Sequence, residues 1–231
     1  MKSMAYKNLG WSLVYLGTTL LFFFRNNIPF LTNMSYLVGI PVLFAAIVLL
    51  CLKGRGAVGI IMALLFSCGG DVSGAQSNAD LQMILFALAH ICYIITFLSH
   101  AHYSLKGIIS TIIFIVMAQV YMFCITYGKF AGGDYATIIY AFVISIMFAS
   151  AMLYDGSYKL LFVIAAGLFV LSDSMIAWER YIGAFPGIGL MIMIIYYVAQ
   201  YLFAYGAMNR EEANHIVFPQ SVKSINQNLV K

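Results

Sequence analysis

Charged side chains are scarce in this sequence. Asp, Glu, Lys and Arg make up 9% of its 231 residues, whereas 63% are hydrophobic. Soluble domains typically contain about 25% charged and about 45–50% apolar residues. The composition therefore excludes an ordinary soluble domain and indicates a protein that crosses the membrane several times. The formal net charge of +4 is not gathered into a basic face, so we expect no nucleic-acid partner.

Cysteine is also rare, with four residues in the whole chain. Cys51, Cys68, Cys92 and Cys124 all lie in apolar segments, without Cys-x-x-Cys or Cys/His spacing. This pattern indicates neither a disulfide framework nor a zinc knuckle. We expect the four to be small packing residues buried in the core.

Long apolar runs are what the sequence has instead. At about 20 residues for each transmembrane helix, the chain suits one all-α bundle of about eight helices with short loops. The first run follows two lysines, as in a signal peptide, but no small-residue cleavage site follows it, so we interpret it as a retained span. The candidate spans are roughly 9–24, 34–52, 56–73, 80–99, 107–127, 135–153, 159–178 and 187–207. Pro41 in the second span predicts a kink and a freed carbonyl.

Lysine and arginine are distributed unevenly over the ends of these spans. Most of them fall at the N-terminus, in the loops after the second, fourth and sixth spans, and in the C-terminal tail. By the positive-inside rule, both termini are then cytoplasmic. We therefore divide the chain into a cytoplasmic N-terminus (1–8), one eight-helix transmembrane domain (9–207) and a cytoplasmic polar tail (208–231). We expect an integral protein of the cytoplasmic (inner) membrane of a bacterium.

Two aspartates fall within apolar spans, where a carboxylate is costly and usually functional. Asp71 comes 16 residues after Arg55, roughly 24 Å into a hydrocarbon layer about 30 Å thick. Asp173 comes 14 residues after Lys159, roughly 21 Å in by the same helix rise. Both spans start on the cytoplasmic side, so we expect the two acids to face one another in the outer half of the membrane.

Other polar residues lie near the same depth. His90, on the fourth span, falls near the midplane, and Tyr93 follows it by three residues on the same helix face. On the last span, Tyr196, Tyr197 and Gln200 form a second polar stripe at spacings of three and four. Together with the acids, they predict a polar cavity that opens toward the outer leaflet.

Two buried carboxyl groups are the minimum set for acid/base hydrolysis without a cofactor. Burial favours the protonated form of one, which can donate, while the other stays ionised and orients water or stabilises a cation. Such a pair suits acetal-like and enol-ether C–O bonds, whose cleavage passes through an oxocarbenium-like ion. The simpler interpretation is that Asp71 and Asp173 cap helix ends at the interface.

Metal and nucleophilic chemistry are weaker alternatives. Asp71, Asp173 and His90 could converge on a zinc ion, yet no helix carries a His-x-x-x-His pair. His100 and His102 are two residues apart beside a loop and are expected at the interface. Three serines, Ser67, Ser172 and Ser174, have no GxSxG elbow around them. Those beside Asp173 are expected to bond helix carbonyls or to orient the carboxylate.

The remaining acids are expected to be solvated charges in loops or the tail. They are Asp80, Asp134, Asp155, Glu211 and Glu212. Glu179 and Arg180 are expected to form an outer interface pair, with Trp178 in the aromatic belt.

Four motifs in register resemble the YhhN-like membrane proteins, whose characterised members are lysoplasmalogenases. They are Phe66-Ser67-Cys68-Gly69-Gly70-Asp71, Phe86-Ala87-Leu88-Ala89-His90-Ile91-Cys92-Tyr93, Gly167-Leu168-Phe169-Val170-Leu171-Ser172-Asp173-Ser174 and Tyr196-Tyr197-Val198-Ala199-Gln200. The resemblance covers residues 36 to 207 and implies an eight-helix bundle that hydrolyses the vinyl ether bond of a lysoplasmalogen to a fatty aldehyde and a glycerophospho-alcohol. The family's aspartates correspond to Asp71 and Asp173, and its histidine to His90.

The resemblance also implies partners and roles. The substrate is a lysophospholipid taken from the bilayer among the membrane lipids, and neither a metal nor a cofactor is expected. Asp71 and Asp173 are the predicted catalytic residues. The predicted substrate-binding residues are His90, Tyr93, Ser172, Tyr196, Tyr197 and Gln200. The chain departs from the family where Ile40-Pro41 replaces a frequent Lys-Pro, so a phosphate would need another cation.

A different class of protein would use the same buried acids. A proton-coupled transporter or a lipid-binding membrane protein can place a carboxylate on a proton relay or a ligand site. Against a transporter, the sequence has no inverted repeat and no paired broken helices.

Overall fold

A computed structural model describes residues 2–127 and 135–210 of the chain. Its α-helices are α1 (Lys2–Phe24), α2 (Ile40–Lys53), α3 (Val58–Ala75), α4 (Ala79–Leu98), α5 (Leu105–Thr126), α6 (Tyr135–Leu153), α7 (Lys159–Tyr181) and α8 (Ile188–Asn209). Short 3₁₀ helices η1 (Arg25–Asn27), η2 (Ser35–Gly39) and η3 (Gly54–Ala57) flank α2 on both sides. The predicted all-α bundle is therefore confirmed.

Seven helices in the described part of the chain are long and apolar enough to cross a membrane. The first of them runs from Ser35 to Lys53 and joins η2 to α2, and the other six are α3 to α8. The eighth helix, α1, begins at Lys2 rather than at residue 9, and it is not among the seven. These spans make the chain an integral membrane protein. Its orientation in the membrane stays a prediction.

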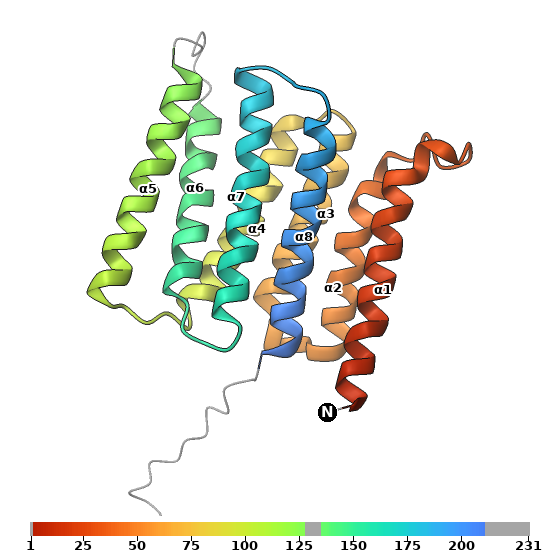
Figure 1. The fold of residues 1–231 in the computed structure, drawn as a ribbon, viewed down its shortest axis with the longest axis horizontal. Helices are drawn as coiled ribbons and strands as arrows, with labels where there is room; N and C mark the ends of the chain where they lie inside the picture. The colour runs from red at the N-terminus through yellow and green to blue at the C-terminus, as the bar shows by residue number, and fades with distance from the viewer. Residues whose placement is uncertain (1, 128–134, 211–231) are drawn as a thin grey trace, which may run out of the picture.

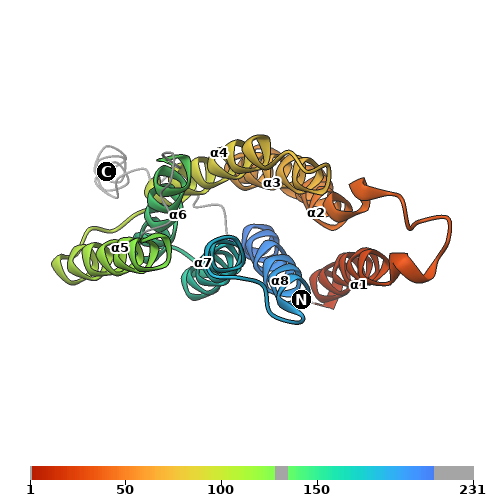
Figure 2. The same cartoon turned by 90° about the horizontal axis from the view of Figure 1, so that it is seen from above.

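The helices form two layers, as the view from above shows (Figure 2). One layer contains α2, α3, α4 and α6, and the other contains α1, α8, α7 and α5. The start of α1 and the end of α8 lie at the same end of the bundle (Figure 1), where Asn8 Nδ2 donates a 2.6 Å hydrogen bond to Asn209 Oδ1. The connections α1–α2, α3–α4 and α7–α8 lie at the opposite end.

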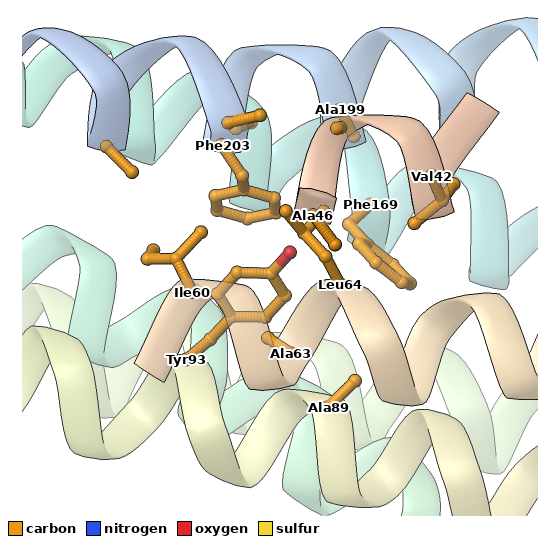
Figure 3. Packing of buried hydrophobic residues seen from close by; sticks show 14 of the residues in the cluster. Val42, Ala46, Ile60, Ala63, Leu64, Ala89, Tyr93, Phe169, Ala199 and Phe203 are labelled. Carbon is orange, nitrogen blue, oxygen red and sulfur yellow. The ribbon is translucent and has the colours of Figure 1, made fainter. Parts of the chain in front are cut away.

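Buried aromatic and small side chains fill the space between the layers. Tyr93 of α4 stacks on Phe203 of α8 with ring centroids 4.1 Å apart, beside Ala63 and Ala199 (Figure 3). Small residues let membrane helices approach closely where the hydrophobic effect gives little drive to associate. A Cβ atom at Gly70 of α3 would lie 3.1 Å from the Phe86 ring of α4, so a larger residue would crowd this contact.

Polar caps set where α4 and α5 begin. Asn78 Oδ1 accepts a hydrogen bond from the Leu81 N–H, and Ser104 Oγ accepts one from the Gly107 N–H. Each satisfies a backbone donor that the first helical turn leaves without a partner. Because α3 ends at Ala75 and α4 starts at Ala79, the connection is tight, and it holds these two helices side by side around the site described below.

The predicted freed carbonyl at Pro41 is wrong. Pro41 lies in the first turn of α2, where its missing N–H would have no helical partner anyway. The carbonyl four residues earlier, that of Leu37, accepts a hydrogen bond from the Ile40 N–H, because the span starts as the 3₁₀ helix η2. The junction of η2 and α2 takes the place of a kink within an α-helix.

The prediction that all four cysteines are buried is wrong for two of them. All four are unpaired, but Cys51 and Cys124 are exposed on the outside of the bundle, while Cys68 and Cys92 are partly buried and pack against the core. On a membrane helix an apolar residue can face lipid as readily as protein, so apolar surroundings in the sequence do not indicate burial.

Candidate active site

Asp173 lies at the centre of a three-residue polar cluster between the layers. Tyr140 of α6 donates a short hydrogen bond from its hydroxyl group to Asp173 Oδ2. His90 Nε2, on α4, lies 3.0 Å from Tyr140 Oη and 3.8 Å from Asp173 Oδ2. The cluster thus joins three helices, and the structure brings the predicted His90 and Asp173 together.

The hydrogen-bond pattern assigns a direction to this cluster. With the Tyr140 hydroxyl donating to Asp173, its oxygen can accept a hydrogen bond from the His90 tautomer that carries its N–H at Nε2. His90 is fully buried, and its Nδ1 has no hydrogen-bond partner among the described residues. The three groups therefore form a donor chain from imidazole through phenol to carboxyl group, along which a proton can move.

Asp71 forms a second tyrosine–aspartate pair. Its Oδ2 accepts a 2.8 Å hydrogen bond from Tyr196 Oη, so α3 and α8 are joined across the layers. Both side chains are buried. The structure therefore brings the predicted Asp71 and Tyr196 into direct contact.

Two phenylalanines are neighbours of both pairs. The Phe169 ring lies 4.7 Å from the His90 ring and 5.4 Å from the Tyr196 ring, measured between centroids. Phe86 packs edge-on against both Phe169 and Tyr196. The two acids thus come from different layers and share an aromatic wall, which keeps the surroundings apolar.

A cavity of about 230 Å³ reaches Asp173. Its lining residues come mainly from the start of α4 and the end of α7, so it lies at the end of the bundle opposite to the N-terminus (Figure 1). The lining residues are Ala79, Gln82, Met83, Phe86, Thr137, Tyr140, Asp173, Ile176, Ala177, Arg180 and Tyr181. The predicted polar cavity is wrong in its lining: of the polar residues predicted to form it, Asp173 alone lines this cavity, and most of the wall is apolar. That this end faces the outer leaflet stays a prediction.

A smaller cavity of about 60 Å³ lies between α5, α6 and α7 on the other side of the cluster. Thr137, Tyr140, Asp173 and Ala177 line both cavities. Asp71 lines neither of them. A ligand in either space can therefore reach Asp173, while Asp71 is hydrogen-bonded to Tyr196 outside both cavities.

The other four predicted substrate-binding residues have hydrogen-bond partners other than the two acids. Tyr93 Oη donates to Gln200 Oε1 at 3.0 Å. Tyr197 Oη donates to the Val38 carbonyl at 2.7 Å, and Ser172 Oγ donates to the Ile192 carbonyl at 3.2 Å. None of the four lines either Asp173 cavity. In this structure they hold helices together around the site.

The remaining polar residues lie at the periphery. His100 and His102 lie in the α4–α5 connection, and Asp80 and Asp155 are exposed. Three acids predicted in loops or the tail, Asp134, Glu211 and Glu212, lie outside the described residues. In the described part of the chain, no group of three or more His, Cys, Asp or Glu side chains is placed to hold a metal ion.

Sequence reasoning missed Tyr140 and underrated Arg180. Tyr140 is one of 16 tyrosines, and no acidic residue falls within its span to mark it. The available signal was Thr137, three residues earlier on the same helix face, since both residues line both cavities. Arg180 was expected only at the interface, yet it lines the larger cavity.

Comparison with known proteins gives one match. The sequence profile of the YhhN family matches residues 31–207. Neither a curated protein nor a solved structure matches the chain. The matched region includes both tyrosine–aspartate pairs and His90.

Proposed function

The chain belongs to the YhhN family, and on this premise we propose that it is a membrane-embedded hydrolase that cleaves the vinyl ether bond of lysoplasmalogens. The products are a fatty aldehyde and a glycerophospho-alcohol, and the reaction consumes one water. The transmembrane domain (9–207) is the catalytic domain in this proposal. Asp173 and Asp71 are the catalytic residues in this proposal.

One observation carries the proposal. Asp173 lines a cavity inside the membrane domain and accepts a hydrogen bond from Tyr140, which is hydrogen-bonded in turn to His90. A structural cap would need neither a cavity nor a donor chain. Intramembrane acids with bonded partners are typical of functional sites. The apolar wall around the cluster also strengthens electrostatic interactions inside it.

The proposed reaction begins with proton transfer to carbon. Asp173, in its protonated form, gives its proton to the vinyl carbon that is not bonded to oxygen, and an oxocarbenium ion forms at the neighbouring carbon. Asp71 favours this cation in its ionised form, in which it accepts the hydrogen bond of Tyr196. Asp173 acts as the donor because it reaches the cavity and Asp71 does not.

Water completes the reaction. The Asp173 carboxylate accepts a proton from a water molecule as the water oxygen adds to the cationic carbon, giving a hemiacetal. The hemiacetal then loses the glycerol oxygen as an alcohol and leaves the aldehyde. Tyr140 and His90 hold the carboxyl group in place and supply a path for its proton.

Aldehyde release from a lyso-vinyl-ether phospholipid by the purified full-length protein tests this function. We expect steady release, unaffected by EDTA, and none from a saturated ether lipid of equal length. A proton-coupled transporter or a lipid-binding protein with the same buried acids makes no product. A folded protein that yields no aldehyde would therefore contradict the proposal.

Labelled water tests the chemistry. In D₂O the released aldehyde should carry one deuterium on the carbon next to the carbonyl, provided that it is reduced to the alcohol at once. In H₂¹⁸O the glycerol oxygen should stay unlabelled, because the bond that breaks joins this oxygen to the vinyl carbon. Label on the glycerol oxygen would indicate cleavage on the glycerol side and exclude the mechanism.

A further inference from the structure

The larger cavity is lined by both the Asp173 carboxyl group and the Arg180 guanidinium group. Arg180 follows Asp173 by seven residues on α7, two helical turns later and about 10 Å along the axis on nearly the same face. Its Cζ lies 5.6 Å from the centroid of the Tyr181 ring, which lines the same cavity. The polar groups of the wall thus gather at two levels, Asp173 with Tyr140 inside and Arg180 with Gln82 at the end of the bundle.

The smaller cavity on the other side of Asp173 is mostly apolar. Ala118, Met122 and Val170 contribute to its wall, together with other residues of α5, α6 and α7. Little of α5 is buried in the protein, so this side of the bundle faces lipid. Asp173 therefore lies between the larger cavity, which Arg180 lines, and the smaller cavity, whose wall is mostly apolar.

We propose that Arg180 binds the phosphate of a single-chain phospholipid, whose hydrocarbon chain points toward the apolar side of Asp173, where the smaller cavity lies. This inference rests on the proposed function and orients its substrate. A guanidinium group is well suited to a phosphate diester, because it presents several parallel N–H donors in one plane.

The spacing fits such a lipid. Seven bonds separate the vinyl carbon that receives the proton from the phosphorus atom, and an extended chain advances about 1.2 Å per bond, or roughly 8 Å in all. This length is close to the roughly 10 Å that separate Asp173 from Arg180 along α7. The vinyl carbon then lies beside Asp173 when the phosphate lies beside Arg180.

No other described cation at this end lines the cavity. The second span contains neither Lys nor Arg before Lys53, which lies at the opposite end. Arg25 belongs to α1, where it donates to the Phe22 carbonyl at 2.9 Å and lies over the Phe22 ring. Among the described residues, Arg180 is thus the cation that this cavity offers to a phosphate.

Binding of two ether lipids that cannot be hydrolysed tests the inference without turnover. The ligands are a 1-O-alkyl lysophospholipid and the 1-O-alkylglycerol with the same chain, both with the purified full-length protein in detergent. We expect the wild-type protein to prefer the phospholipid, and Arg180→Gln to weaken phospholipid binding by roughly tenfold to a hundredfold while alkylglycerol binding is unchanged. Arg180→Lys should keep most of the preference, and Arg25→Gln, a matched loss of charge at the same end, should keep all of it.

Equal weakening of both ligands in Arg180→Gln, or an unchanged preference, would overturn the assignment. The glycerophospho-alcohol with the same head group carries the same phosphate diester without a chain and should displace the phospholipid only weakly. Displacement at a comparable concentration would mean that the site takes a free phosphate rather than a lipid. Because neither ligand is turned over, a preference lost with Arg180 in a protein that releases no aldehyde would refute the proposed hydrolysis and leave the phosphate site standing.

Discussion

At the scale of single residues, the site consists of two acids that each accept a hydrogen bond from a tyrosine on another helix. The Tyr140 hydroxyl donates to Asp173, and the Tyr196 hydroxyl donates to Asp71. A buried carboxyl group needs such donors, because an unpaired charge in an apolar interior costs several kcal/mol. The difference between the pairs is access, since Asp173 alone lines the cavities described above.

Removing the Tyr140 hydroxyl should slow the chemistry. Tyr140→Phe deletes the group between His90 and Asp173, and a hydrogen bond to a charged group is worth about 1.5–3 kcal/mol, so we expect kcat to fall roughly tenfold to a hundredfold with little change in KM. Steady-state kinetics on the vinyl ether substrate would measure kcat and KM of Tyr140→Phe and of the wild-type protein.

Tyr121→Phe is the matched control for this prediction. Tyr121 lines the smaller cavity, and its hydroxyl donates to the Ser174 carbonyl rather than to an acid. Its kcat should stay within about twofold of wild type, since no hydrogen bond to a charged group is lost. Equal losses in the two variants would show that Tyr140 acts only through packing.

The residues of the site could be predicted from the sequence only in part. Asp71, Asp173 and His90 were found because a charged or titratable group in an apolar span is rare. Tyr140 could not be found in this way, because tyrosine is common in this chain and its role depends on which helix lies opposite. Likewise, the sequence does not show that the Tyr197 hydroxyl donates to the Val38 carbonyl while that of Tyr196, the preceding residue, donates to Asp71.

At the scale of elements, close helix contacts depend on small residues. A Cβ atom at Gly206 of α8 would lie 2.7 Å from the Phe162 ring of α7 and 2.9 Å from the Leu161 side chain. Phe162 is fully buried, so the ring has little room to yield. This contact lies near the end of α8, far along the helix from Tyr196.

Gly206→Ala should therefore destabilise the bundle without a specific effect on catalysis. Overpacking a tight contact costs about 1–3 kcal/mol, and we expect a lower midpoint of thermal unfolding in detergent with kcat of the folded fraction unchanged. Gly189→Ala, on the same helix with nothing within 4 Å of the added Cβ, should change the free energy of unfolding by less than about 1 kcal/mol. Equal midpoints for the two variants would refute this account of the α7–α8 contact.

Helix positions were predictable, while their ends and details were less so. Predicted and observed bounds of most spans agree within a few residues, because apolar length follows membrane thickness. The start of α1 at Lys2 was missed, since two lysines and an asparagine hide a helix that continues beyond the apolar run. At Pro41, a rule for α-helix interiors was applied to a segment that begins as a 3₁₀ helix.

At the scale of the whole molecule, the two layers explain why the site lies where it does. The acids, His90 and the two tyrosines come from five helices, α3, α4, α6, α7 and α8, which belong to both layers (Figure 2). Periodicity within one helix cannot show which helices face each other, so the layer arrangement lay beyond the sequence.

Both termini should be reached from the cytoplasm. The start of α1 and the end of α8 lie at one end of the bundle, and the excess of Lys and Arg in the sequence assigns that end to the cytoplasm. Protease treatment of inside-out vesicles should remove epitope tags from both termini, whereas right-side-out vesicles should protect both. Cleavage of one tag in each preparation would contradict the fold, and cleavage of both from outside would reverse the orientation.

Turnover of the vinyl ether lipid by Asp173→Asn, Asp71→Asn and the control Asp155→Asn, an exposed loop acid, tests the central claim most directly. All three should remain folded and extractable in detergent. We expect no detectable aldehyde from Asp173→Asn, at least about a hundredfold lower kcat from Asp71→Asn, and wild-type release from Asp155→Asn. Undiminished release by a folded Asp173→Asn protein would contradict the account.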